Sequence, residues 1–196
     1  MSHQTTIARA IAAAVTQQAK RAHRIAALAM LALASAVVPG MAQAQAGIPL
    51  TGASVVTVGQ THSCTLVGGG IKCWGGGIDG QLGNGTSGRL PDGSPNQSSF
   101  AVDVAGIGNA VDVAAGDHHA CAVGDDGAVR CWGRNDYGQL GDGTQQSSAV
   151  PVDVVGIGGA SGLTARKVEA GAGHTCAIVD TATVTGAVYC WGSNEF

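Results

Sequence analysis

The chain has 196 residues, is rich in glycine (32 residues) and carries a formal net charge of −3 at pH 7. Residues 47–196 hold all 13 acidic residues but only six of the ten lysines and arginines, so their formal charge is −7. A segment this acidic repels nucleic acid and anionic membrane surfaces, and its shortage of Glu and Lys disfavours helices. We therefore expect an all-β protein without a nucleic-acid partner.

The N-terminal residues have the pattern of a secretory signal peptide. Residues 1–24 include four Lys or Arg and no acid, and residues 25–38 form an apolar run of 14 residues. The small-x-small sequence ending at Ala44 and Ala46 is typical of a signal cleavage site. The alternative is an uncleaved anchor, although the run is shorter than the ~20 residues that span a membrane. We expect residues 1–46 to be removed, leaving an exported chain with no membrane segment, secreted or periplasmic.

Residues 47–196 contain one sequence unit three times. Each copy begins with Gly-x-x-His-x-Cys and ends with Cys-Trp-Gly, and the tryptophans are spaced 58 and 59 residues apart. Such self-similarity indicates a repeat architecture. The repeated positions are His62, His119 and His174; Trp74, Trp132 and Trp191; and Gly-Gln-Leu-Gly at Gly80, Gln81, Leu82 and Gly83 and at Gly138, Gln139, Leu140 and Gly141.

Each copy predicts a β-hairpin in which its two cysteines face each other. The turns would be Gly68-Gly69, a type I′ pair, then Asp125–Gly127 with a left-handed glycine, then a seven-residue loop at Asp180–Gly186. Further strands precede the hairpins in SVVTVG, AVDVAAG and ARKVEAG. About four short antiparallel strands per repeat are what a β-propeller blade requires.

The second copy carries a family resemblance. Residues 119–144, HACAVGDDGAVRCWGRNDYGQLGDGT, resemble the repeat of the regulator of chromosome condensation family. The resemblance implies four-stranded blades of a seven-bladed propeller. Some relatives are guanine-nucleotide exchange factors for a small GTPase, and others are secreted bacterial inhibitors of β-lactamases. Only about three blades are present, so we expect an incomplete ring from a truncated product, with open blade edges available for self-association.

The six cysteines are expected to form one disulfide in each hairpin. Export favours oxidation, and the repeat makes local pairing the simplest of the fifteen connectivities. Two alternatives stay open: buried free thiols, or zinc held by two cysteines and the histidine of a unit. The predicted pairs are Cys64–Cys73, Cys121–Cys131 and Cys176–Cys190.

The glycine-rich stretch Cys131–Thr144 is predicted to be a turn and blade joint, not a ligand loop. It lacks the Gly-Lys-Ser/Thr of a phosphate loop and the acids of an EF-hand, so no cofactor or metal is expected. Asn135 aligns with Gly77, which suggests left-handed backbone there. The tryptophans would pack within or between blades; the alternative is exposed contact residues on the propeller rim.

We expect a non-enzymatic, protein-binding module, because no acid–base constellation recurs in the repeats. Loops on a rigid scaffold usually carry specificity. We expect the partner to bind loops on one rim of the propeller, and the candidates are the loops that differ among the copies: Ser87–Ser99, Asp125–Gly127 and Asp180–Gly186. We expect Arg89 and Asp92 in the first of these to contribute to capture of an unknown partner. The alternatives are an exchange factor for a small GTPase and an inhibitor-like binder of a β-lactamase or cell-wall enzyme.

Overall fold

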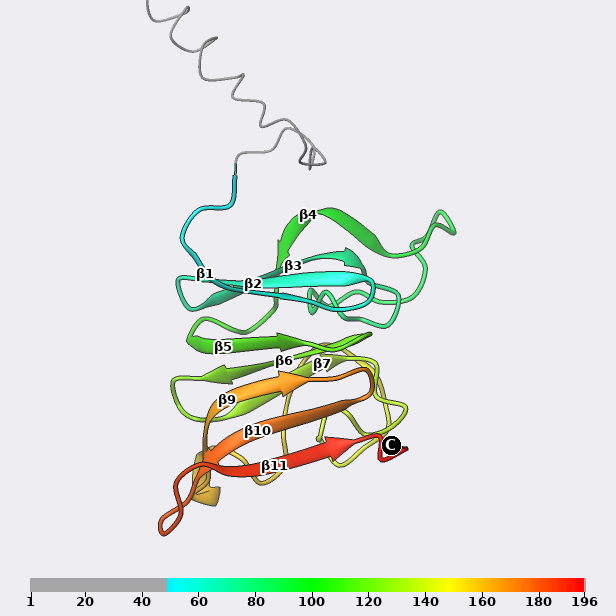
Figure 1. Ribbon diagram of the computed structural model, residues 1–196. Helices are drawn as coiled ribbons and strands as arrows, with labels where there is room; N and C mark the ends of the chain where they lie inside the picture. Colours follow the sequence, from blue (N-terminus) through cyan, green and yellow to red (C-terminus); the bar gives the residue numbers. More distant parts are fainter. Residues whose placement is uncertain (1–48, 196) are drawn as a thin grey trace, which may run out of the picture. The chain divides into compact units, whose positions relative to one another are not determined.

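The computed structural model describes residues 49–195, which form eleven short strands and one 3₁₀ turn, Gly159–Ser161 (Figure 1). The predicted signal peptide, with Ala44 and Ala46, lies outside these residues. None of the helical structure described is long and apolar enough to cross a membrane. The predicted all-β fold is confirmed.

The strands form three antiparallel sheets, and within each sheet the strands are neighbours in chain order. The first two sheets have the predicted four strands, whereas the third has three within the described residues. The first sheet contains β1 Ala53–Val58, β2 His62–Val67, β3 Gly70–Gly76 and β4 Gln97–Asp103. The second contains β5 Ala110–Ala115, β6 His119–Gly124, β7 Val129–Gly133 and β8 Ser148–Asp153. The third contains β9 Thr164–Ala170, β10 His174–Asp180 and β11 Ala187–Gly192.

The hairpin registers are those predicted from the cysteine spacing. The two cysteines of each hairpin are paired across the strands in all three sheets. In the first hairpin Gly68 and Gly69 have φ of 57° and 83°, as a type I′ turn requires. In the second, Gly127 has φ of 73°, a left-handed backbone that a side chain would strain. Local turn chemistry therefore sets the register of each blade.

The sheets stack on one another through alternating strand faces. The cysteine face of the first sheet, with Leu66 and Ile71, is buried against Val113 and Trp132 of the second. The second sheet is covered in the same way by the third. Fully burying each such side chain contributes about 1.5–3 kcal/mol. Sheets contact only their neighbours in chain order, so no ring closes within residues 49–195.

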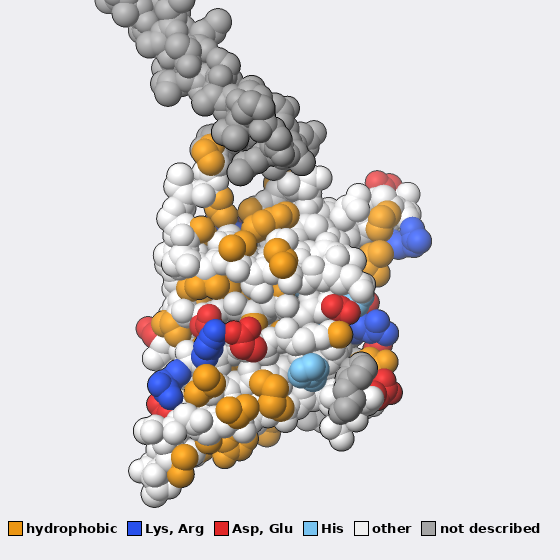
Figure 2. Space-filling model, viewed as in Figure 1, with side chains coloured by type: hydrophobic (Ala, Val, Ile, Leu, Met, Phe, Trp, Pro, Cys, Tyr) orange, Lys and Arg blue, Asp and Glu red, His pale blue; other side chains and the backbone are white. Residues whose placement is uncertain are grey.

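The outer faces of this stack are partly apolar. In the third sheet the cysteine face is not covered by another sheet among the described residues, and Val188 is 66% exposed there. Val56 and Val58 are exposed on the outer face of the first sheet. Hydrophobic side chains are visible over both of these sheets in Figure 2. The middle sheet alone is therefore buried on both faces, as blades inside a propeller are.

The ends of the strands form two rims. We call the end at which β2, β6 and β10 begin the histidine rim; it lies at the right in Figure 1. We call the opposite end, which carries the β2–β3, β6–β7 and β10–β11 turns, the hairpin-tip rim. The long connections from β3 to β4 and from β7 to β8 both begin at the histidine rim, so this rim carries most of the irregular structure.

Candidate protein-binding rim

Each histidine closes a tight turn on the histidine rim. The Gly116 N–H donates to the His119 carbonyl at 2.9 Å, and the same bond joins Gly59 to His62 and Gly171 to His174. A Cβ at Gly116 would lie 2.3 Å from both the His119 ring and the Gly171 carbonyl oxygen, so only glycine fits. The Gly-x-x-His signature is thus a turn that also lets neighbouring sheets approach closely.

The Trp and Gly-Gln-Leu-Gly motifs meet across the interfaces between sheets. Trp132 Nε1 donates to the Gln81 carbonyl at 3.1 Å, and Trp191 Nε1 donates to the Gln139 carbonyl at 2.9 Å. A Cβ at Gly83 would lie 2.8 Å from Trp132 Nε1, which explains the last glycine of the motif. Trp74, at the corresponding place in the first sheet, is half-buried. The indoles that have a neighbour therefore pack between blades.

The buried histidines belong to these interfaces. His119 Nε2 is 2.9 Å from Thr175 Oγ1, which in turn donates to the Gln139 carbonyl at 3.0 Å. His62 has no such neighbour, and both of its ring nitrogens lack a hydrogen-bond partner in the described structure. Burial, and to a smaller extent the nearby histidines, lower the pKa of His62 and of His119 to about 4. Both rings are therefore neutral at physiological pH and inaccessible to a substrate.

The joint after the second sheet depends on a buried asparagine. Asn135 Oδ1 accepts from the Leu140 N–H at 2.9 Å, and its amide donates to Asp142 Oδ1 at 3.1 Å and the Thr144 carbonyl at 3.2 Å. The expectation of left-handed backbone at Asn135 is wrong, because no non-glycine residue described has positive φ. Gly77, its counterpart, is not left-handed either. The asparagine is needed for its side chain, which satisfies the turns of the joint.

In the first joint, an asparagine from the long loop makes the corresponding hydrogen bonds to the turns. Asn96 Nδ2 donates to the Gly77 carbonyl and to Thr86 Oγ1, each at 3.1 Å. A Cβ at Gly77 would lie 3.0 Å from Asn96 Nδ2, so the amide occupies the space that a side chain at Gly77 would need. Loop Ser87–Ser99 is therefore anchored at its end by a buried residue, while its tip projects from the rim (Figures 1 and 2).

The cysteines form one disulfide per hairpin, with Cα–Cα distances of 4.0–4.1 Å. Cys64–Cys73 and Cys121–Cys131 are fully buried beneath the next sheet, whereas Cys190 of the third pair is exposed. Sulfurs joined to each other do not serve as zinc thiolates. Three disulfides suggest that the chain folds in an oxidising compartment.

Two grooves open on the histidine rim, one at each interface between sheets. The first, about 380 Å³, is lined by residues of the first sheet's joint and by His118. His118 Nδ1 lies 3.3 Å from Asp79 Oδ2, without the alignment of a hydrogen bond, so the contact is an ion pair when His118 is protonated. A contact between side chains of two sheets thus crosses the first groove.

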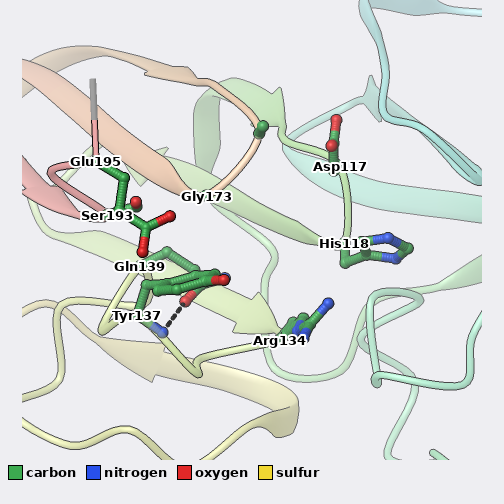
Figure 3. A pocket seen from close by; sticks show the side chains of 9 residues that line it. Asp117, His118, Arg134, Tyr137, Gln139, Gly173, Ser193 and Glu195 are labelled. Carbon is green, nitrogen blue, oxygen red and sulfur yellow. Dashed lines mark hydrogen bonds between the residues drawn. The ribbon is translucent and has the colours of Figure 1, made fainter.

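The second groove, about 250 Å³, has different contents at the corresponding positions. Tyr137 replaces Asp79, Gly173 replaces His118, and Tyr137 is 46% exposed. A Cβ at Gly173 would lie 3.3 Å from Tyr137 Cδ2, so the ring lies over the glycine. In Figure 3 Glu195 extends toward this ring, and Arg134 lies on the other side of the groove. The second groove is therefore open, with an aromatic wall.

A glutamine supports the start of each groove wall. Gln139 Oε1 accepts from the Tyr137 N–H at 2.9 Å, the bond dashed in Figure 3, and Gln81 Oε1 accepts from the Asp79 N–H at 2.9 Å. Both glutamines are almost fully buried. The repeated motif contains both glutamines, whereas Asp79, His118 and Tyr137 lie outside it and were not predicted as site residues. Each of these three residues differs from its aligned counterpart in the next or preceding copy, and this difference is the signal that could have found them.

The three variable loops do not form one surface. Ser87–Ser99 joins β3 to β4 on the histidine rim, whereas Asp125–Gly127 and Asp180–Gly186 are hairpin turns on the opposite rim. The acids of those turns are also bound internally. Asp126 pairs with Arg130 at 3.0 Å, and Asp180 pairs with Arg166 at 2.9 Å. The expectation of a single binding rim made of all three loops is wrong, because strand length separates their positions.

In the long loop, the two residues expected to contact a partner have local hydrogen bonds. Asp92 Oδ1 accepts from the Ser94 N–H at 2.9 Å and from its hydroxyl at 2.6 Å. Arg89 donates to the Gly93 carbonyl at 2.8 Å. These bonds hold the tip in one turn, and Leu90 beside them is 39% exposed. Asp92 therefore shapes the loop, and Arg89 and Leu90 are the better candidates for contact.

Comparison with known proteins identifies the repeat. The sequence model of the regulator of chromosome condensation (RCC1) repeat matches residues 69–123 and 126–178, more than half of the chain. A second model of this repeat matches residues 110–139 and 165–196. The ultraviolet-B receptor UVR8 of Arabidopsis thaliana is 32% identical over 143 residues, which are 72% of this chain and 30% of the receptor.

Solved structures agree on the fold. Human WBSCR16 has a TM-score of 0.57 at 25% identity, over 74% of this chain and 34% of that protein. Yeast RCC1 (Prp20), in its complex with Kap60, has a TM-score of 0.57 at 21% identity, over 73% of this chain and 30% of that chain. The chain thus spans about a third of the length of these proteins. UVR8 is named as a receptor, and RCC1 is named as a regulator of chromosome condensation.

Proposed function

The chain belongs to the RCC1 repeat family, and from this premise we propose that it is an exported, non-enzymatic binding module that holds a protein partner on its histidine rim. The open second groove, with its exposed tyrosine, is the observation that carries the proposal. Loop Ser87–Ser99 projects from the same rim and adds a second contact region. Propellers present rim loops from a rigid scaffold, and such loops commonly bind partners.

Export is part of this proposal. We propose that residues 1–46 are a signal peptide cleaved after Ala46 and that the mature chain is secreted or periplasmic. The disulfides support it, because structural disulfides persist in oxidising compartments. N-terminal sequencing of the exported protein should begin at Gly47, and mass spectrometry without reductant should find no alkylated cysteine. Six alkylated cysteines in the exported protein would contradict the proposal.

Capture experiments with matched variants test the binding rim. The full chain, expressed with an affinity tag, is used to capture proteins from envelope extract. We expect Leu90→Ser and Arg89→Gln to reduce the captured amount several-fold, because both residues lie on the histidine rim. Val184→Ser, on the hairpin-tip rim and 52% exposed, is the matched control and should leave capture unchanged. Loss with the control but not with the rim variants would place binding elsewhere.

No observation on individual residues favours exchange-factor activity. Structures of the yeast protein Prp20p were studied together with its binding to Gsp1p and histones, but the identity with this chain is 20%. A likeness at this level concerns the fold, and function depends on particular sites. No observation on individual residues favours binding to a β-lactamase or cell-wall enzyme either. The capture experiment would detect such a partner directly.

A further inference from the structure

The segment that follows Cys-Trp-Gly, which we call the joint, differs among the three copies in its charged residues. The difference is whether the joint has an acidic side chain on the histidine rim and whether an arginine of the same joint pairs with it. In the second joint Arg134 and Asp136 form an ion pair at 2.6 Å. The corresponding residues of the first joint, Gly76 and Ile78, carry no charge. The third copy has Ser193 and Glu195 there, so the acid is present and the arginine is missing. Within residues 49–195 Glu195 has no ion-pair partner.

The position of this acid is open to solvent. Asp136, the counterpart of Glu195, has a side chain that is 52% exposed, although its joint is complete and a further sheet packs beside it. Exposure at this position is thus a property of the rim. An exposed carboxylate is free to pair with a cation supplied by another molecule.

Tyr137 provides an aromatic surface in the same groove as Glu195 (Figure 3). In the first groove the matching space is crossed by Asp79 and His118. In the second groove Tyr137 packs over Gly173 and is 46% exposed, so part of the ring stays accessible. Cations bind over tyrosine rings, and a guanidinium can stack on a ring and pair with a carboxylate at once.

The remaining charges of the second groove favour a cation. Asp117 also lines the groove, and its carboxylate has one long contact, 3.5 Å from Gln60 Nε2. The positive charge of Arg134 is already matched by Asp136, whose hydrogen bond raises the pKa of the guanidinium. His118 also lines this groove, and its ring contacts Asp79 of the first joint. The unmatched charges among the lining residues are therefore those of Asp117 and Glu195, which are negative.

We propose that the second groove binds an arginine side chain of the partner protein, which stacks on Tyr137 and pairs with Glu195. The partner's guanidinium would pair with Glu195 in the third copy as Arg134 pairs with Asp136 in the second copy. This inference rests on the proposed function and adds the chemistry of the partner: a protein segment that presents an exposed arginine. Arginine is preferred over lysine because its planar group can make both contacts together.

A peptide titration tests this without the natural partner. The probe is acetyl-Ala-Arg-Ala-amide, and acetyl-Ala-Gln-Ala-amide is the uncharged control; binding is followed by NMR on the full chain. We expect the arginine peptide alone to shift the Tyr137 ring and Glu195 amide signals. Tyr137→Ala and Glu195→Gln should each raise the dissociation constant about threefold or more. Shifts confined to other surfaces, or unaffected by both variants, would overturn the proposal.

A substitution at Ser193 tests the same idea without removing an acid or the aromatic ring. Ser193→Arg restores the Arg–acid pattern of the second joint, so the new side chain should pair with Glu195 and abolish peptide binding. Ser193→Gln is the matched control, since it adds a long polar side chain without charge, and should retain binding. Equal affinity in both variants would contradict the proposed role of Glu195.

The two proposals fail in distinguishable ways. If partner capture is lost with Leu90→Ser but unchanged by Glu195→Gln and Tyr137→Ala, the arginine site is overturned and the binding module stands. If the arginine peptide binds at Tyr137 but no rim variant affects capture, the binding rim of the proposed function is overturned.

Discussion

The first and second interfaces between sheets have the same architecture and differ at one buried position. At the second interface Thr175 links His119 to the carbonyl of Gln139. At the first interface Ala120 takes the place of that threonine, and His62 has no hydrogen-bond partner among the described residues. One hydroxyl thus decides whether the buried imidazole has a hydrogen-bond partner at all, since His119 Nδ1 is unpaired in the described structure as well. Repeats that align well can still differ in their interior hydrogen bonding.

This difference separates what every blade contact needs from what one contact adds. The indole–carbonyl bond and the glycine beneath the indole are present at both interfaces. The histidine–threonine bond is present at one. Packing is therefore the common requirement, and the polar link is an addition of about 1 kcal/mol that a blade can lack.

The largest expected effect comes from removing the shared indole. Trp132 is fully buried, so Trp132→Ala should lower the free energy of unfolding by about 3–5 kcal/mol through the cavity it leaves. Trp191 is half-buried, so Trp191→Ala should have a smaller effect. Urea unfolding followed by circular dichroism measures both. Equal losses of unfolding free energy in the two variants would show that the burial of the indole does not determine its contribution to stability.

Counted for a single residue, acidification should have the next largest effect. The pKa of His62 and of His119 is about 4 in the folded chain, against 6.5 in the unfolded chain. Between pH 6.5 and 4 the unfolded chain binds protons that the folded chain excludes, so stability falls as pH decreases. The loss reaches about 3 kcal/mol for each histidine once the pH is below 4.

The pH dependence is tested by unfolding His62→Gln and the unaltered chain at several pH values. Each protein is compared with its own stability at pH 7.5, which removes the constant cost of the substitution. The variant should lose about 3 kcal/mol less than the unaltered chain on acidification. If acidification lowers the free energy of unfolding equally in the two proteins, the folded chain accepts a proton on His62 as readily as the unfolded chain does.

The smallest expected effect is that of the hydroxyl itself. Thr175→Val keeps the shape but removes the link to His119, and should lower the free energy of unfolding by about 1–2 kcal/mol. Ala120→Thr should give His62 the partner that it lacks. Its matched control is Ala120→Val, and we expect the threonine variant to be about 1 kcal/mol more stable than the valine variant. If the two are equally stable, the threonine hydroxyl does not reach His62.

Much of the blade follows from local sequence. Gly68-Gly69 and Gly127 specify their turns, and the two-residue alternation of strand faces then places the cysteines opposite each other. These features involve residues close along the chain, so a sequence contains the information directly. The same reasoning failed at Asn135, where a side chain buried in the joint, and not the backbone conformation, explains the residue.

The grooves could not be predicted in this way, because they are made by residues that are distant along the chain and belong to different sheets. Asp79 meets His118, and Tyr137 covers Gly173, only because the sheets stack. Stacking also buries two disulfides and leaves the third exposed, although the three hairpin sequences are alike. The sequence by itself determined the repeat, the hairpins and their register through local turn geometry. Tertiary packing alone decided which rim carries a groove and which charges in it are unmatched.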